Sequence, residues 1–172
     1  IRRNALSLMK YNGDNVQEFE KINKSVELCN TSNDSPAVAH CSKFIPTNRS
    51  HVNDNELCHY LDSMKPPTID EKNDEGSRNG VIILGVGRVL SGVLRSKDVE
   101  YYCFGPKYNP MRDANSICKK AIRLYLLMGS SYVRVNAVPA GHICAIHGLE
   151  ELQLKTVTIC SLPHAMPLSV ID

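Results

Sequence analysis

Short apolar runs separated by glycine- and proline-containing turns make up most of the hydrophobic pattern of this chain. In residues 132–138 apolar and polar side chains alternate, which is the pattern of a half-buried strand. Residues 117–128 are apolar enough for a helix or a strand, and the alternation in their second half favours a strand. Further strands are predicted at residues 37–45, 80–96, 99–105, 142–147 and 156–161. Regularly spaced short strands of this kind predict an all-β barrel or sandwich.

The longest apolar run, residues 80–96, is interrupted by three glycines. They are Gly85, Gly87 and Gly92. Glycine inside a strand marks a bulge or a bend, and a barrel needs such bends in order to close. We therefore expect a closed or nearly closed β-barrel over residues 37–162. Residues 99–105 should form a hairpin with the preceding strand through a turn at 96–98.

One amphipathic helix is predicted before the barrel, over residues 14–29. Its apolar residues recur at helical spacing, and Asp14 can cap its first turn. A turn-forming segment, residues 30–36, follows the helix, and residues 148–155 form a turn or short helix. The chain is accordingly divided into a helix with a linker, the barrel, and a final linker or strand, which are residues 1–36, 37–162 and 163–172.

Residues 46–79 differ in composition from the rest of the chain. They hold four Lys or Arg and seven Asp or Glu, a charge of −3, which leaves +5 on the remainder of a chain of net charge +2. The segment is rich in Asn, Ser and Pro and has too few apolar residues to offset the entropy lost on ordering. We expect a long, largely disordered acidic insertion with at most one helical turn, near Glu56–Leu61.

Composition restricts the class of protein. A chain of 172 residues, 42% of them hydrophobic, is large enough for one globular domain with appendages. The sequence has no apolar run long enough to span a bilayer, so no membrane partner is expected. Seven cysteines without a Cys-x-x-Cys pair fit free thiols in a reducing compartment. The chain begins at Ile1 without an initiator Met, which indicates either an excised fragment of a longer protein or a processed chain. We expect the fragment to be monomeric.

Nucleotide-binding motifs are missing from the sequence. No Gly-x-x-x-x-Gly-Lys-Ser/Thr loop and no Asp-x-x-Gly occurs, and Asn23-Lys24-Ser25 is followed by Val26 instead of the Asp that guanine recognition needs. Gly85 and Gly87 form only part of a dinucleotide fingerprint. We therefore expect no bound nucleotide cofactor in this chain.

A stand-alone enzyme that uses a metal ion or a catalytic cysteine is the remote alternative. His142, Cys144 and His147 are close in sequence, but on a strand His147 points away from the other two and no fourth ligand is evident. Cys103 and Cys160 would need a neighbouring base to act as nucleophiles, and both lie in apolar runs where a cysteine is typically inert. No catalytic, cofactor-binding or metal-binding residue is assigned.

Several motifs resemble the second domain of elongation-factor-2-like translational GTPases. The similar segments are Ser42–Thr47, Gly87–Gly92, Gly105–Pro110, Leu124–Gly129 and Leu154–Pro163. The resemblance covers residues 37–45 and 80 to about 162. The last three segments and the acidic insertion are most similar to the branch of the family that acts in maturation of the large ribosomal subunit. His142 departs from the family pattern, which usually has Asn after the Pro-x-Gly turn.

This resemblance implies a non-catalytic module. It implies a closed domain II β-barrel with Greek-key-like connections, joined through residues 1–36 to a GTPase domain and through residues 163–172 to later domains. GTP and magnesium would bind to that GTPase domain. The implied role, in the cytoplasm, is GTP-dependent release of an anti-association factor from the large subunit. Translocation by elongation factor 2 itself, or work in the related spliceosomal GTPase, remains an alternative.

Basic residues between positions 88 and 123 are candidates for contact with ribosomal RNA. Lys and Arg side chains bind phosphates through charge, without reading sequence. The candidates are Arg88, Arg95, Lys97 and Lys107, several of which lie on or beside the similar motifs. The alternative is an ordinary solvated surface.

The missing phosphate loop leads to a direct expectation. In a titration with a fluorescent guanine nucleotide, this chain should show no saturable binding at micromolar concentration, because no Gly-rich loop is present to surround the phosphates. Micromolar binding would contradict the interpretation of the chain as a module without nucleotide chemistry.

Overall fold

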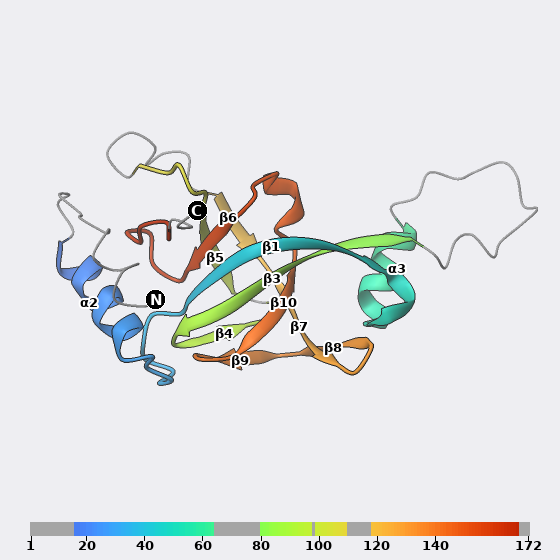
Figure 1. Ribbon diagram of the computed structural model, residues 1–172, viewed down its shortest axis with the longest axis horizontal. Helices are drawn as coiled ribbons and strands as arrows, with labels where there is room; N and C mark the ends of the chain where they lie inside the picture. Colours follow the sequence, from blue (N-terminus) through green and yellow to red (C-terminus); the bar gives the residue numbers. More distant parts are fainter. Residues whose placement is uncertain (1–15, 64–79, 98, 110–117, 169–172) are drawn as a thin grey trace, which may run out of the picture.

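The computed structural model describes residues 16–63, 80–97, 99–109 and 118–168, and strands hold more of these residues than helices do (Figure 1). The strands are β1 (Val38–Asn48), β2 (Val52–Asn53), β3 (Val81–Ser91), β4 (Val93–Arg95), β5 (Glu100–Phe104), β6 (Cys118–Ala121), β7 (Arg123–Met128), β8 (Ser131–Val135), β9 (Ala137–Pro139), β10 (Ile143–His147) and β11 (Val157–Cys160). The helices are α2 (Val16–Glu27) and α3 (Asn55–Ser63), with single 3-10 turns η1 (Arg49–His51) and η4 (Glu150–Leu152). Neither α-helix is long and apolar enough to cross a membrane.

Nine strands form one sheet, and its order shows how far the barrel prediction holds. The order is β2-β8-β7-β10-β3-β1-β11-β5-β6, with β4 and β9 paired separately. The mostly-β prediction is confirmed. Closure is not confirmed, because the sheet begins at β2 and ends at β6, and among the described residues these two strands do not pair. The two-residue β2 is too short to provide a closing edge.

The main core lies between the large sheet and the β4–β9 pair. Leu94 of β4 lies opposite Val138 of β9, and the two side chains are 0% and 1% exposed. They belong to the same buried cluster as Ile122, Leu124 and Ile146 from the large sheet. The two-stranded sheet therefore covers a face of the curved nine-stranded sheet and completes the core that the apolar strand positions require.

Gly92 makes the corner between β3 and β4 that the sequence predicted. Its φ of +66° lies in the left-handed region, and an added Cβ would lie 2.7 Å from the carbonyl oxygen of Ser35. The Gly92 amide donates to the Asn30 carbonyl at 2.7 Å, and its own carbonyl accepts from the Ala140 amide at 2.9 Å. Only glycine fits this close approach of three backbone segments.

The predicted hairpin between residues 80–96 and 99–105 is wrong. β4 pairs with β9, whereas β5 pairs with β11 and β6. The expected turn residues make tertiary contacts instead: the Ser96 amide donates to the Asn136 carbonyl at 2.8 Å and the Lys97 amide to the Ile122 carbonyl at 2.9 Å. These long-range bonds lead the chain away from β4 before β5 begins.

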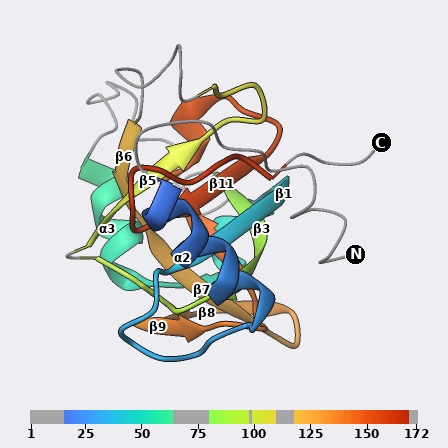
Figure 2. The same cartoon turned by 90° about the vertical axis from the view of Figure 1, so that its left-hand side faces the viewer.

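The predicted N-terminal helix is α2, which packs against the end of the sheet and the C-terminal segment (Figure 2). Ile22 and Val26 are buried beside Val38, Phe104 and Ala165. The helix ends with Cys29 at φ 48°, and the Asn30 amide donates to the Ser25 carbonyl at 3.0 Å, the pattern of a Schellman cap. Asp14 lies outside the described residues. Residues 163–168, expected as a linker or strand, form no strand and pack against α2.

The predicted disorder of residues 46–79 is wrong for its first half. β1 continues to Asn48, and η1, β2 and α3 follow in order. Val52 is 4% exposed and Leu57 is 0% exposed, both in a cluster with Leu84 and Tyr125. Two well-placed apolar side chains and a paired polar network order this segment despite its polar composition. Residues 64–79 lie outside the described part of the chain.

Burial of Leu57 leads to a stability prediction. Leu57→Ala should lower the free energy of unfolding by about 2–5 kcal/mol, because it removes a fully buried side chain and leaves a cavity. Urea denaturation followed by circular dichroism measures the change. Tyr60→Ala on the same helix is the control, since Tyr60 is 48% exposed and should matter little. Equal stability of Leu57→Ala and the wild type would mean that α3 does not pack as described.

Candidate functional site

The densest set of charged contacts surrounds the carboxylate of Asp54, which is the N-cap of α3. Its Oδ1 accepts from the Leu57 amide at 3.1 Å, the bond expected of an N-cap residue. Its Oδ2 accepts from the Tyr125 hydroxyl at 2.8 Å. The Asp54 side chain is only 1% exposed. A buried carboxylate of this kind requires compensating charge.

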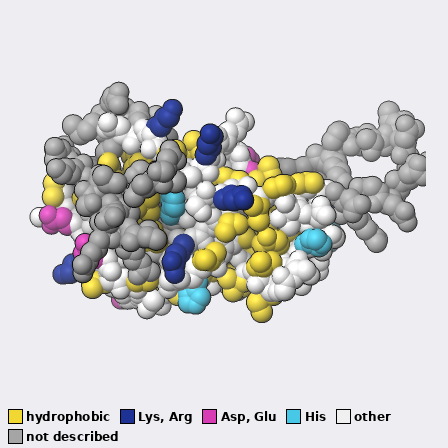
Figure 3. Space-filling model, viewed as in Figure 1, with side chains coloured by type: hydrophobic (Ala, Val, Ile, Leu, Met, Phe, Trp, Pro, Cys, Tyr) yellow, Lys and Arg dark blue, Asp and Glu magenta, His cyan; other side chains and the backbone are white. Residues whose placement is uncertain are grey.

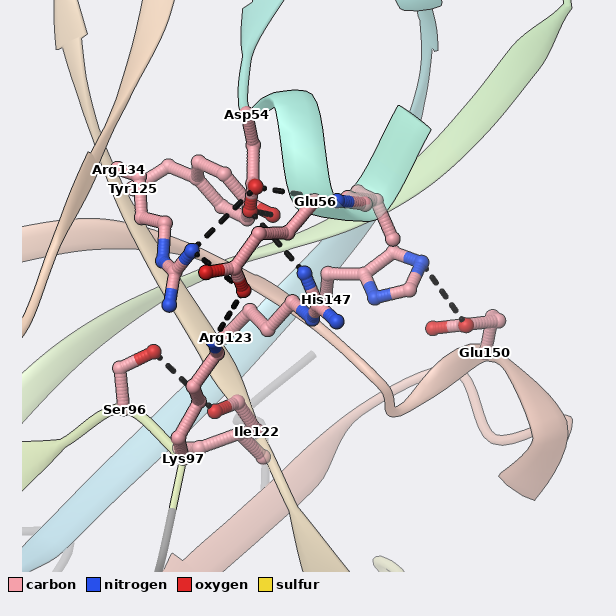
Figure 4. Close-up of polar contacts among 11 residues, drawn as sticks. Asp54, Glu56, Ser96, Lys97, Ile122, Arg123, Tyr125, Arg134, His147 and Glu150 are labelled. Carbon is pink, nitrogen blue, oxygen red and sulfur yellow. Dashed lines mark hydrogen bonds and ion pairs between the residues drawn. The ribbon is translucent and has the colours of Figure 1, made fainter. Parts of the chain in front are cut away.

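Two arginines supply that charge from the neighbouring strands (Figure 4). Arg123 of β7 has its Nη1 3.4 Å from Oδ2 of Asp54, and Arg134 of β8 has its Nη1 3.5 Å from Oδ1. Position 123 and position 125 share one face of β7, because side chains alternate along a strand. The pairing of β7 with β8 sets Tyr125 opposite Arg134. The sheet therefore brings all three partners to the start of α3.

A second carboxylate extends this arrangement to the segment after β4. Glu56 contacts Nη1 of Arg134 at 3.0 Å and also pairs with the ammonium of Lys97. Lys97 has a φ of 58°, and its amide is held by the Ile122 carbonyl. We call the six residues together the Asp54 network: Asp54, Glu56, Lys97, Arg123, Tyr125 and Arg134.

The network sets the ionisation of its members. Burial opposes the charged form of Asp54, but the Leu57 amide, the Tyr125 hydroxyl and the two arginines outweigh it, so the pKa of Asp54 lies below its ordinary value. Burial, together with the bond to Asp54, raises the pKa of Tyr125. At neutral pH the carboxylate is ionised and the phenol is protonated, so the hydrogen bond between them has one clear direction.

This arrangement is suited to holding elements together and not to catalysis. The Asp54 carboxylate is buried and its oxygens accept from or contact four groups of the chain itself, which leaves no room for a substrate. The contacts join α3 to β7, to β8 and to the segment between β4 and β5. The Asp54 network thus fixes the insertion to the sheet.

The four predicted RNA contacts lie at separate places. Arg88 of β3 donates from Nε and Nη2 to the Gly141 carbonyl, each at 3.3 Å. Arg95 of β4 donates to Oδ1 of Asn33 at 3.0 Å. Lys97 belongs to the Asp54 network, and Lys107 is exposed in the turn after β5. No hydrogen bond or ion pair among the described residues joins any two of them, and Figure 3 shows Lys and Arg side chains separated from one another over the visible face.

A groove of about 410 Å³ lies between β1, β3 and the segment after η4. Phe44, Ile83 and Leu154 provide its apolar lining, and Lys43 and Lys155 lie at its sides. Ile83 is 45% exposed, which is unusual for an isoleucine of a central strand. Hydrophobic side chains also gather on the face shown in Figure 3.

The metal and cysteine alternatives gain no support from the geometry. Cys144 is buried in the core, whereas His142 is exposed and His147 pairs with Glu150 at 3.3 Å. Within the described ranges, no group of three or more His, Cys, Asp or Glu could hold a metal ion. Burial raises the pKa of Cys103 and of Cys160 to about 12, so both thiols are protonated at neutral pH.

The sequence interpretation missed the Asp54 network because Asp54 lies in a polar segment that reads as an insertion. A signal was nevertheless present: Asp54 precedes Leu57 and Leu61, which are spaced one helical turn apart, as expected of an N-cap before an amphipathic helix. The partners Arg123 and Arg134 carried no comparable signal, because the strand alternation gives their face but not their neighbours.

The depressed pKa of Asp54 predicts a pH-dependent stability difference. Ionised Asp54 stabilises the fold above its unfolded pKa of about 4, and this contribution is lost as pH falls through the lower folded pKa. Asp54→Asn should therefore cost about 2 kcal/mol of unfolding free energy at pH 7 and progressively less in acid. Chemical denaturation of both proteins between pH 2.5 and 7 measures this difference in unfolding free energy.

The control for this experiment is Glu151→Gln, which removes an exposed carboxylate paired with Lys120. A side chain that is 72% exposed should contribute little at any pH. A difference for Asp54→Asn that stays constant down to the lowest pH would contradict the assignment of the effect to the ionised carboxylate.

Several curated proteins are similar to this chain, among them the following three. Ribosome assembly protein 1 of Schizosaccharomyces pombe is 38% identical over 104 residues, which are 60% of this chain and 10% of that protein. Elongation factor-like GTPase 1 of Homo sapiens is 31% identical over 127 residues, which cover 62% of this chain and 11% of that protein. The Mus musculus protein of the same name is 28% identical over 123 residues, which cover 61% of this chain and 10% of that protein.

No protein-family model matches the chain. The chain spans about a tenth of the length of these curated relatives. Their names agree with the motifs at residues 105–110, 124–129 and 154–163, which were most similar to the branch that acts in maturation of the large subunit. The resemblance is therefore confirmed: homologues of this chain, over a segment of their length, include ribosome assembly protein 1 and elongation factor-like GTPase 1.

Proposed function

We propose that this chain is a non-catalytic β-barrel module of an elongation-factor-2-like GTPase that works in maturation of the large ribosomal subunit. The observation that carries the proposal is the 38% identity to a ribosome assembly protein over 104 residues. The mostly-β fold supports it, since the buried cluster between the nine-stranded sheet and the β4–β9 pair is what a domain II barrel would enclose.

In this proposal the chain transmits conformational change and a separate domain performs the chemistry. GTP and magnesium bind to the GTPase domain of the same protein, and hydrolysis there drives release of the anti-association factor from the large subunit in the cytoplasm. Two features support this division of roles. The sequence lacks the phosphate loop, and the Asp54 network has the internal pairing of a structural element.

The RNA-facing residues of the proposal are Arg88, Arg95, Lys97 and Lys107, with different roles. Lys107 is exposed, and Arg88 and Arg95 each contact only neutral groups among the bonds described above, so their charge can still attract phosphates. Lys97 is neutralised by Glu56 and acts chiefly through the Asp54 network. RNA contact therefore rests mainly on the other three side chains.

The test is binding to large ribosomal subunits. Arg95→Glu combined with Lys107→Glu should weaken co-sedimentation of the chain with purified large subunits about tenfold or more at low salt, because two phosphate contacts are replaced by repulsion. The variant should also show a shallower dependence of affinity on salt, by about two counterions. Circular dichroism verifies that the variant is folded.

The matched control carries the same change of charge on another surface. Lys21→Glu with Lys24→Glu alters two exposed lysines of α2 and should bind large subunits nearly as well as the wild type. Equal binding of both variants at low and moderate salt would contradict the proposed RNA face. Absence of binding by the wild type as well would contradict the proposed module itself.

A further inference from the structure

Two cysteines lie directly opposite each other at the edge of the sheet. β5 and β6 are antiparallel, and their register pairs Cys103 with Cys118. Directly opposite residues of an antiparallel pair project to the same face, with Cα atoms about 4.5–5.5 Å apart. A disulfide needs Cα atoms about 4.4–6.8 Å apart, and directly opposite strand positions meet this Cα criterion. Both thiols are free in the structure.

We propose that Cys103 and Cys118 form a reversible disulfide by exchange with a low-molecular-weight disulfide such as oxidised glutathione. The proposal concerns this chain's own strands and is independent of the proposed function. It assigns a modification site to the outer end of the sheet, where β6 is an edge strand.

The register distinguishes this pair from the other strand cysteines. Cys41 of β1 and Cys144 of β10 are both opposite Gly87 of β3, one on each side of it. They are therefore two strand spacings apart, about 9.5 Å, which is beyond the reach of a disulfide. Among the described strand pairings, Cys103 and Cys118 are the only cysteines placed opposite each other.

The surroundings define the order of the reaction. Cys118 is partly exposed, whereas Cys103 is 6% exposed and burial raises its pKa to about 12. The external disulfide therefore reacts first at Cys118. The ammonium of Lys120 opposes part of the effect of burial on the pKa of Cys103.

Exchange proceeds in two balanced steps. The Cys118 thiolate attacks one sulfur of the small disulfide, forms a mixed disulfide and releases one small thiolate, which takes up a proton from solvent. Cys103 then loses its proton and its sulfur attacks the Cys118 sulfur, so that the second small thiolate leaves. The two protein thiols are oxidised, and one small disulfide is reduced to two thiols.

The crosslink would change the stability of the sheet edge. It connects β5 to β6 across the fourteen residues 104–117 that join them. Closing a loop of this length removes conformational entropy from the unfolded chain. The oxidised chain should therefore unfold at a higher temperature, by about 5 °C or more.

The experiment equilibrates the chain in glutathione redox buffers and maps disulfides by mass spectrometry after alkylation and trypsin digestion. Trypsin cleaves after Lys97, Lys107, Arg112 and Lys119, so the expected product joins peptide 98–107 to peptide 113–119. This product should increase with the fraction of oxidised glutathione and disappear with dithiothreitol. The unfolding temperature, measured in the same samples, should rise with it.

Variants separate the pair from general cysteine oxidation. Cys118→Ser and Cys103→Ala should each abolish both the joined peptide and the rise in unfolding temperature. Cys58→Ser, which changes another partly exposed cysteine, should retain both. Glutathione that stays on Cys118 without a joined peptide would overturn the proposal, as would an equal yield of crosslinks between other cysteines. A rise in unfolding temperature that persists in Cys118→Ser would overturn it as well.

Discussion

The antiparallel ladder between β1 and β3 is the constraint on which the rest of the fold depends. Its register runs from Val38 opposite Ser91 to Asn48 opposite Val81, and these are the two longest strands of the sheet. The ladder ends where the Arg49 amide donates to the Gly80 carbonyl at 2.8 Å. The acidic segment therefore leaves and returns at one end of a hairpin, and lengthening such a loop adds little to the entropy of closing it. A long insertion is tolerated here because the ladder, and not the loop, specifies the pairing.

The Asp54 network explains how the polar segment that contains β2 and α3 packs against the large sheet. Two buried apolar residues, Val52 and Leu57, would provide only a small anchor on their own. Asp54 adds a helix cap and pairs with arginines from two strands, so that the same carboxylate starts α3 and attaches it to the sheet. The burial of that charge is costly unless every partner is in place. The insertion and the β7–β8 hairpin are thus coupled.

The reactive groups of the described residues include several that are buried or paired within the chain. Buried thiols with raised pKa and internally paired carboxylates are stabilising features in the part of the chain that is described. Exposed features of the described residues include basic side chains such as Lys107, and the groove beside Phe44. One of the relatives is named for ribosome assembly. Under the proposed function, these features would meet RNA and protein surfaces there.

The sequence by itself located most of the strand-forming segments, and it gave both ends of β5, β10 and β11 to within about one residue. Alternation and turn residues located β10, β11, the corner at Gly92 and the helix α2, because these signals come from residues close together in the chain. Only the tertiary structure decided that β5 pairs with β11 and β6, that the sheet stays open, and that Asp54 is buried. Asp54 contacts arginines 69 and 80 positions away. Local patterns show which face of a strand is buried, whereas strand partners and buried charges depend on the summed energy of contacts between distant segments.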